Sequence, residues 1–297
     1  MMPVYVVALS LSAGMCFATC MIVFKWSNIW RDAGQGTMFM MFVCLCLWSA
    51  LTLARTFVVF SGVDNWDSLE LPDVLSVSIG TETLFNAVSM WFALSAYELY
   101  RRAVRPRLQH QSQRILKLYS GVVYSVALIF IATVVTMERL QIRFLARDGG
   151  NDLVASWILC YMTWGTWGIH LLSLLYGAVI AISLFCQRHQ LQLAKLPMAL
   201  LVIVGLFFLL NMPYLIVAPL SEYESTSDVT IVEWPIMLKL LRAMTYSSGA
   251  VISVIMGVSI RGFDAFYAPT ASSQSKMSFR GPPSFFILAD STSHISC

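Results

Sequence analysis

Residues 74–102 read VLSVSIGTETLFNAVSMWFALSAYELYRR. The part from 74 to 97 is mostly apolar, and a bilayer core about 30 Å thick needs roughly 20 such residues of helix to cross it. Arg101 and Arg102 follow directly. Lysine and arginine accumulate on the cytosolic side of membrane proteins. The stretch therefore predicts a membrane helix whose C-terminal end faces the cytosol.

The whole chain has the composition of a membrane protein. Of its 297 residues, 58% are hydrophobic and 12% are charged, and the mean hydropathy is +0.72. A soluble domain carries about 25% charged residues, so lipid has to be the solvent for much of this chain. The net charge of +3 is too small to indicate nucleic-acid binding. The seven cysteines show neither a disulfide framework nor metal-type spacing.

Seven stretches are long and apolar enough to cross a bilayer. Backbone groups in lipid must bond within their own segment, so each stretch is predicted to be a helix. We expect an all-α, seven-transmembrane helix bundle over residues 1–267, with spans near 3–24, 37–60, 74–97, 118–137, 157–186, 198–219 and 237–260. Aromatic residues spaced as on one helix face predict a short amphipathic helix at 261–267. The Ser-rich residues 268–297 are expected to form a disordered tail.

The basic residues predict the orientation of the bundle. Segments after the first, third, fifth and seventh spans hold 13 lysines and arginines, whereas the other three loops hold 3. By the positive-inside rule, the loop 101–117 is cytosolic. The N-terminus is then outside or lumenal, and the C-terminal tail is cytosolic.

Charged side chains inside the predicted spans suggest a pocket. Arg55, Glu82 and Arg242 all lie toward the outer leaflet, and a charge within a membrane helix costs a few kcal/mol unless it is paired or reaches water. We expect Glu82 to pair with Arg55 or Arg242, and these three residues with Asn86 to form the floor of a ligand pocket. Two alternatives stay open: a salt bridge that only locks helices together, and snorkelling of the basic side chains to the headgroups.

Two further polar groups lie deep in the spans. Asn211 precedes Pro213 by two residues, and proline removes a backbone donor and bends a helix. These two residues are candidates for a hinge, with a static kink as the alternative. His170 is alone in the fifth span, where an interhelical hydrogen bond is the expected role.

The cytosolic end of the third span is a candidate partner surface. Glu98 and Arg102 are spaced i, i+4 and can pair on one helix face. The surface is expected to comprise Glu98, Tyr100, Arg101, Arg102 and Arg105. Attraction of this basic loop to anionic lipid explains the same residues without a partner protein.

The sequence contains no constellation typical of an enzyme. The four histidines are scattered, and there is neither a Gly-rich phosphate loop nor an inward-facing pair of acids. We therefore expect no enzymatic activity, no cofactor and no metal.

Two segments resemble motifs of G-protein-coupled receptors. FFLLNMPY resembles the sixth-helix pattern at Phe207 and Pro213, although Asn211 replaces its tryptophan. ELYRRAVRP is similar to the end of the third helix at Glu98 and Tyr100, with Leu99 in place of the arginine. The seventh-helix Asn-Pro-x-x-Tyr motif is absent. The resemblance implies a receptor-like bundle with altered switches.

Three stretches resemble the plant tobamovirus multiplication protein family, whose members are seven-helix and receptor-like. They are ALSAYELYRRA at 93–103, LLYG at 174–177 and ARTFVVF at 54–60, which includes Arg55. The resemblance implies a multi-pass protein of the vacuolar or other endomembranes, or of the plasma membrane. Members of that family act as membrane anchors for viral replication proteins together with a small GTPase.

These observations favour a receptor-like or scaffold membrane protein that recruits a cytosolic partner, such as a small GTPase or a G protein. A divergent G-protein-coupled receptor for an unknown ligand is the first alternative. A small-solute transporter is the second, although the seven spans show no duplicated pattern of broken helices.

Overall fold

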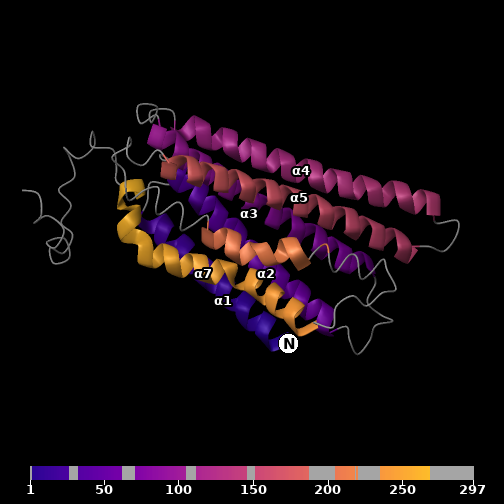
Figure 1. Cartoon of the computed structure of the whole chain (residues 1–297). Helices are drawn as coiled ribbons and strands as arrows, with labels where there is room; N and C mark the ends of the chain where they lie inside the picture. Colours follow the sequence, from indigo (N-terminus) through magenta and orange to yellow (C-terminus); the bar gives the residue numbers. More distant parts are fainter. Residues whose placement is uncertain are drawn as a thin grey trace, which may run out of the picture. The chain divides into compact units, whose positions relative to one another are not determined.

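The computed structural model describes residues 2–26, 33–61, 71–104, 112–145, 151–186, 205–217, 219 and 235–267. Within these ranges every regular element is an α-helix, which confirms the all-α prediction there. Seven helices are formed, and one of them, Gly205–Val217, carries no label in Figure 1. The others are α1 (Met2–Trp26), α2 (Ala33–Ser61), α3 (Leu71–Val104), α4 (Ser112–Leu145), α5 (Asn151–Cys186) and α7 (Pro235–Tyr267).

Among the described helices, four are long and apolar enough to cross a membrane. Their apolar segments are Pro3–Ile22, Gly36–Phe57, Gln113–Met137 and Cys160–Cys186, which match four of the predicted spans. The helix Gly205–Val217 is apolar but shorter, and the first part of its predicted span, 198–204, lies outside the described residues. α3 and α7 are long enough but carry more polar and charged side chains. Their crossing of the membrane remains a prediction.

Helix α3 lies at the centre of the packing. It contacts α2, α4 and α5, while α1 packs against α2 and α4 packs against α5 (Figure 1). Its buried side chains include Phe85, Val88, Trp91 and Phe92. Asn86, Ala87 and Ser89 are buried on its other faces, so α3 is enclosed on most sides by the bundle.

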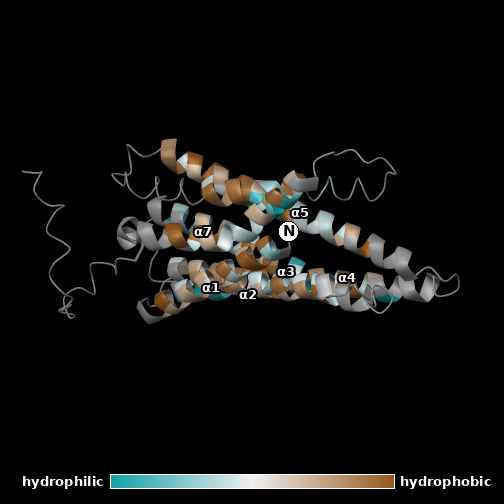
Figure 2. Ribbon diagram, turned by 90° about the horizontal axis from the view of Figure 1, so that it is seen from below, coloured by the Kyte–Doolittle hydropathy of each residue, from teal (hydrophilic) through white to brown (hydrophobic). Residues whose placement is uncertain are grey.

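The outward faces of the bundle are also apolar. Leu118, Leu128 and Ile129 of α4 and Leu172 of α5 are all exposed, and Figure 2 shows hydrophobic residues along the bundle helices. Exposed apolar surface of this extent is unfavourable in water and favourable in lipid. The outward faces therefore agree with a membrane environment.

Small residues bring the helices close together. At Gly249 of α7, an added Cβ would meet the side chains of Ser12 and Cys16 of α1. At Gly177 of α5, it would lie 2.7 Å from the ring of Phe92 of α3. Membrane helices use such small residues to approach each other, because lipid provides no hydrophobic drive between them.

The segment 261–267 continues α7 and is not a separate helix. No proline interrupts residues 250–267, so helical hydrogen bonding extends to Tyr267. Residues 268–297, predicted to be a disordered tail, lie outside the described residues.

Candidate ligand-binding cavity

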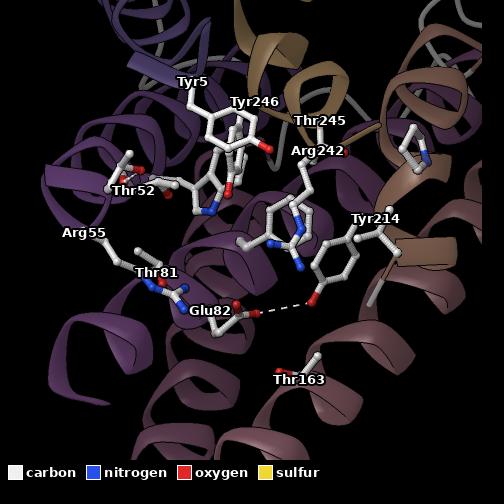
Figure 3. A pocket seen from close by; sticks show the side chains of 15 residues that line it. Tyr5, Thr52, Arg55, Thr81, Glu82, Thr163, Tyr214, Arg242, Thr245 and Tyr246 are labelled. Atoms are coloured by element: carbon white, nitrogen blue, oxygen red, sulfur yellow. Dashed lines mark hydrogen bonds between the residues drawn. The ribbon is translucent and has the colours of Figure 1, made fainter. Parts of the chain in front are cut away.

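A cavity of about 410 Å³ lies between helices α1, α2, α3, α5, Gly205–Val217 and α7 (Figure 3). Small-molecule sites occupy about 300–1,000 Å³, so the cavity has the size of a small ligand site. Its lining combines charged, aromatic and threonine side chains.

Three of the four predicted pocket residues line this cavity. Arg55 comes from α2, Glu82 from α3 and Arg242 from α7. Figure 3 shows the two arginine side chains reaching toward Glu82. The structure thus brings together charges that are far apart in the sequence.

The expected ion pair of Glu82 is not formed. Oε2 of Glu82 instead accepts a long hydrogen bond of 3.4 Å from the hydroxyl of Tyr214, on the helix Gly205–Val217. Over the described ranges, neither Arg55 nor Arg242 makes a hydrogen bond or a salt bridge. The prediction that Glu82 pairs directly with an arginine is therefore wrong, because the arginines approach it without reaching bonding distance while Tyr214 does.

Aromatic rings form one wall of the cavity. The ring centroids of Trp48 and Phe85 lie 5.0 Å apart in a stacked arrangement, and those of Trp48 and Tyr246 lie 6.2 Å apart. Tyr214 meets Phe85 edge-on at 4.9 Å. Such pairs each add about 0.5–1.5 kcal/mol beyond area burial, so the wall is held in place by its own contacts.

Two threonine hydroxyls of the cavity lack partners. Oγ1 of Thr52 and Oγ1 of Thr245 are buried, and neither has a hydrogen-bond partner within the described structure. A buried hydroxyl without a partner costs about 1–3 kcal/mol. Both threonines line the cavity, so their hydroxyls are candidate hydrogen-bond donors to a ligand.

Asn86, the fourth predicted pocket residue, lies below the cavity. Its Nδ2 donates to Oγ1 of Thr166 on α5 at 3.2 Å, and the side chain is buried. Asn86 follows Glu82 by four residues, which places it one helical turn, about 6 Å, deeper along α3. The prediction that Asn86 lines the pocket is corrected accordingly.

His170 forms the interhelical hydrogen bond that was predicted. Its Nδ1 lies 2.6 Å from Oγ of Ser89 on α3, and its ring stacks on Phe85 with centroids 4.6 Å apart. Since Phe85 also lines the cavity, His170 and Ser89 form a polar layer directly beneath the cavity floor.

Replacing Ser89 with alanine should destabilise the protein by about 1–3 kcal/mol, because Nδ1 of buried His170 loses its partner. The measurement is the thermal unfolding midpoint of the purified chain in detergent, with a shift of roughly 2–4 °C for each kcal/mol. Ser125→Ala on an exposed position of α4 is the control. Equal midpoints for the two variants would contradict the role given to the Ser89–His170 contact.

The candidate hinge residues lie beside the cavity. Pro213 lines it, and Nδ2 of Asn211 donates to the carbonyl of Phe207 at 2.9 Å. Nε1 of Trp167 on α5 donates to the carbonyl of Leu215 at 2.9 Å. A proline removes a hydrogen bond one turn earlier, and these side-chain bonds support the helix around it. Motion at this hinge stays a prediction.

The opposite end of α3 carries a partly buried ion pair. Oε1 and Oε2 of Glu98 accept from Nη2 and Nε of Arg101 at 2.6 and 2.9 Å, and Oε2 also accepts from the hydroxyl of Tyr119 on α4 at 3.1 Å. These hydrogen bonds raise the pKa of Arg101 above its ordinary value. Glu98 is fully buried, so the expectation that it lies on a partner surface is wrong. The contact with Tyr119 draws it inward.

The structure describes the side chains of only two of the other predicted surface residues. Tyr100 is half-buried, and the Arg101 side chain is 15% exposed. The predicted i, i+4 pairing of Glu98 with Arg102 cannot be followed, since the Arg102 side chain and residue 105 lie outside the described residues.

The fold and the cavity define an all-helical protein with membrane-length helices and a charged cavity between them. No protein-family model and no curated protein matches the chain.

Proposed function

We propose that this chain is a receptor-like integral membrane protein that binds a small ligand in the cavity and recruits a cytosolic partner at the opposite end of the bundle. The observation that carries the proposal is the convergence of Arg55, Glu82 and Arg242 from three helices on one cavity. Charges at membrane depth are costly and are retained mainly where they serve a function.

The proposal includes seven membrane crossings, with α3, α7 and the segment around Gly205–Val217 added to the four apolar helices. The N-terminus is then outside or lumenal, and the ends of α3 and α4 that carry Arg101, Arg114 and Lys117 face the cytosol. In this orientation the cavity opens toward the outer side. The resemblance of three stretches to the tobamovirus multiplication protein family supports such an arrangement.

The partner surface is proposed on basic groups at the ends of α3 and α4. Arg114 and Lys117 are exposed on the first turns of α4, close in sequence to Arg101 and Tyr100 on α3. A cluster of exposed cations favours an acidic partner such as a small GTPase or a G protein.

Proximity labelling from a C-terminal fusion in the native cell tests this proposal. We expect a cytosolic GTPase-class protein to be labelled by the natural sequence and to lose at least about 80% of its labelling with Arg114→Gln/Lys117→Gln, since rim charges mainly control association. Arg139→Gln, an exposed position near the other end of α4, is the matched control. Labelling of lumenal proteins alone, or equal labelling by both variants, would refute partner recruitment.

A divergent G-protein-coupled receptor is the second candidate, favoured by the partly buried Glu98–Arg101 pair at the end of α3. Stimulation of nucleotide exchange on a purified Gα subunit by the chain in nanodiscs would favour this candidate. Solute flux into liposomes would favour a transporter instead.

A further inference from the structure

We infer that the cavity binds a small monoanion, a carboxylate attached to an apolar and preferably aromatic body. This inference rests on the proposed function, because it specifies the ligand of the same cavity. It follows from three features of the described residues: a guanidinium without a counter-charge, two hydroxyls without hydrogen-bond partners and an aromatic wall.

The charges of the described residues that line the cavity do not balance. Two guanidinium groups, those of Arg55 and Arg242, face one carboxylate, that of Glu82. Arg55 lies near enough to Glu82 to attract it electrostatically. Arg242 interacts electrostatically with the phenols of Tyr5 and Tyr246, and these phenols are neutral near pH 7. Among the residues that the structure describes, one positive charge of the cavity is left without a counter-charge, and a monoanionic ligand would supply it.

The unpartnered hydroxyls point to an acceptor group on the ligand. Thr245 follows Arg242 by three residues and Thr52 precedes Arg55 by three, so each hydroxyl shares a helix face with a guanidinium. An ionised carboxylate only accepts hydrogen bonds and has about four lone-pair positions. It can therefore accept from a guanidinium and a hydroxyl together, whereas an ammonium group would be repelled by both arginines.

The aromatic wall of the cavity suits an apolar body. Trp48, Phe85 and Val217 line the cavity beside Pro213. With a volume of about 410 Å³, the cavity is large enough for a single substituted ring. Aromatic walls favour offset-stacked or edge-on rings.

Three probes that share one body and differ in charge test the inference. The full chain in phosphatidylcholine nanodiscs is heated with 10 mM 3-phenylpropionate, 3-phenylpropanamide or 3-phenylpropylamine. We expect the acid to raise the unfolding midpoint by about 3 °C or more, as ligand linkage predicts, and the amide and amine by less than about 1 °C. A decanoate arm distinguishes a membrane-derived acid from a soluble one. A larger shift with the amine, or no shift with either acid, overturns the inference.

Matched variants locate the binding. Arg242→Gln should weaken 3-phenylpropionate at least about tenfold, since hydrogen bonds to charged groups contribute about 1.5–3 kcal/mol. Lys239→Gln, an exposed residue of the same helix that does not line the cavity, should leave binding unchanged. Thr245→Val removes an unpartnered hydroxyl, so it should not lower the midpoint of the ligand-free chain but should weaken binding about threefold or more.

Thr245→Val still tests the inference if Arg242→Gln fails to fold. Valine has nearly the same shape as threonine, so this variant is expected to fold. The inference would be overturned if Thr245→Val and Arg242→Gln both bound the acid as the natural sequence does. If Arg242→Gln does not fold, Arg55→Gln takes its place in this comparison. Binding of the amine with partner labelling intact would refute only the ligand class. Loss of partner labelling with acid binding intact would refute only partner recruitment.

Discussion

Replacing Glu98 with alanine is expected to lower the free energy of unfolding by about 3 kcal/mol, which corresponds to a midpoint lower by roughly 6–12 °C. The side chain is fully buried and accepts hydrogen bonds from Arg101 and Tyr119. Its removal leaves Arg101, whose side chain is only 15% exposed, without the carboxylate that it binds. Thermal unfolding of the purified chain in detergent measures the loss.

A double-mutant cycle attributes this loss to the contact between α3 and α4. The double variant Glu98→Ala/Tyr119→Phe should be more stable than the sum of the single effects indicates, by about 0.5 kcal/mol or more, because the two groups share one hydrogen bond. Arg114→Ala, an exposed charge on α4, is the control and should change the stability by less than about 0.5 kcal/mol. Additive effects would mean that Tyr119 does not bind Glu98.

Replacing Gly249 with valine is expected to cost about 3 kcal/mol. The new Cβ would meet Ser12 and Cys16 of α1, with Sγ of Cys16 at 2.8 Å and Cδ2 of Leu45 at 3.4 Å. Overpacking a tight interior costs about 1–3 kcal/mol, and valine adds two further methyl groups in the same place. The expected result is a lower unfolding midpoint in detergent and a smaller yield of monodisperse protein.

The control for this substitution is Gly14→Val. Gly14 lies on α1, and nothing approaches its missing Cβ within 4 Å. Both variants undergo the same change in intrinsic helix propensity. The difference between their unfolding midpoints therefore measures packing between α1 and α7. If the two variants unfolded at the same temperature, α1 and α7 would not be in contact at Gly249.

The location of the cavity could be predicted from charged residues alone. Lipid penalises Arg55, Glu82 and Arg242 unless they meet at a shared polar site, and these residues line one cavity. Helical spacing from them would also have found Thr52 and Thr245, each three residues from an arginine. Tyr214 could not be found in this way, because its contact with Glu82 depends on which face of the helix Gly205–Val217 turns toward α3.

The depth of a residue along its helix and the identity of its hydrogen-bond partner were harder to predict than the helix face on which it lies. Asn86 shares a helix face with Glu82, but it lies one turn deeper along α3. There its amide donates a hydrogen bond to Thr166 of α5. At the other end of α3, i, i+3 and i, i+4 partners of Glu98 are both within reach. The sequence spacing does not distinguish them, whereas the structure places Arg101 on Glu98 with Tyr119 beside it.

Glycosylation mapping in microsomes tests the arrangement of the bundle in the membrane most directly. A flexible Gly/Ser segment of about 20 residues with one Asn-x-Thr acceptor is inserted after Leu108 or after Ser227. Seven crossings with a cytosolic arginine-rich loop predict that the chain is glycosylated at the second insertion and not at the first. Glycosylation at the first insertion, or at neither, would contradict the proposed topology and the outward opening of the cavity.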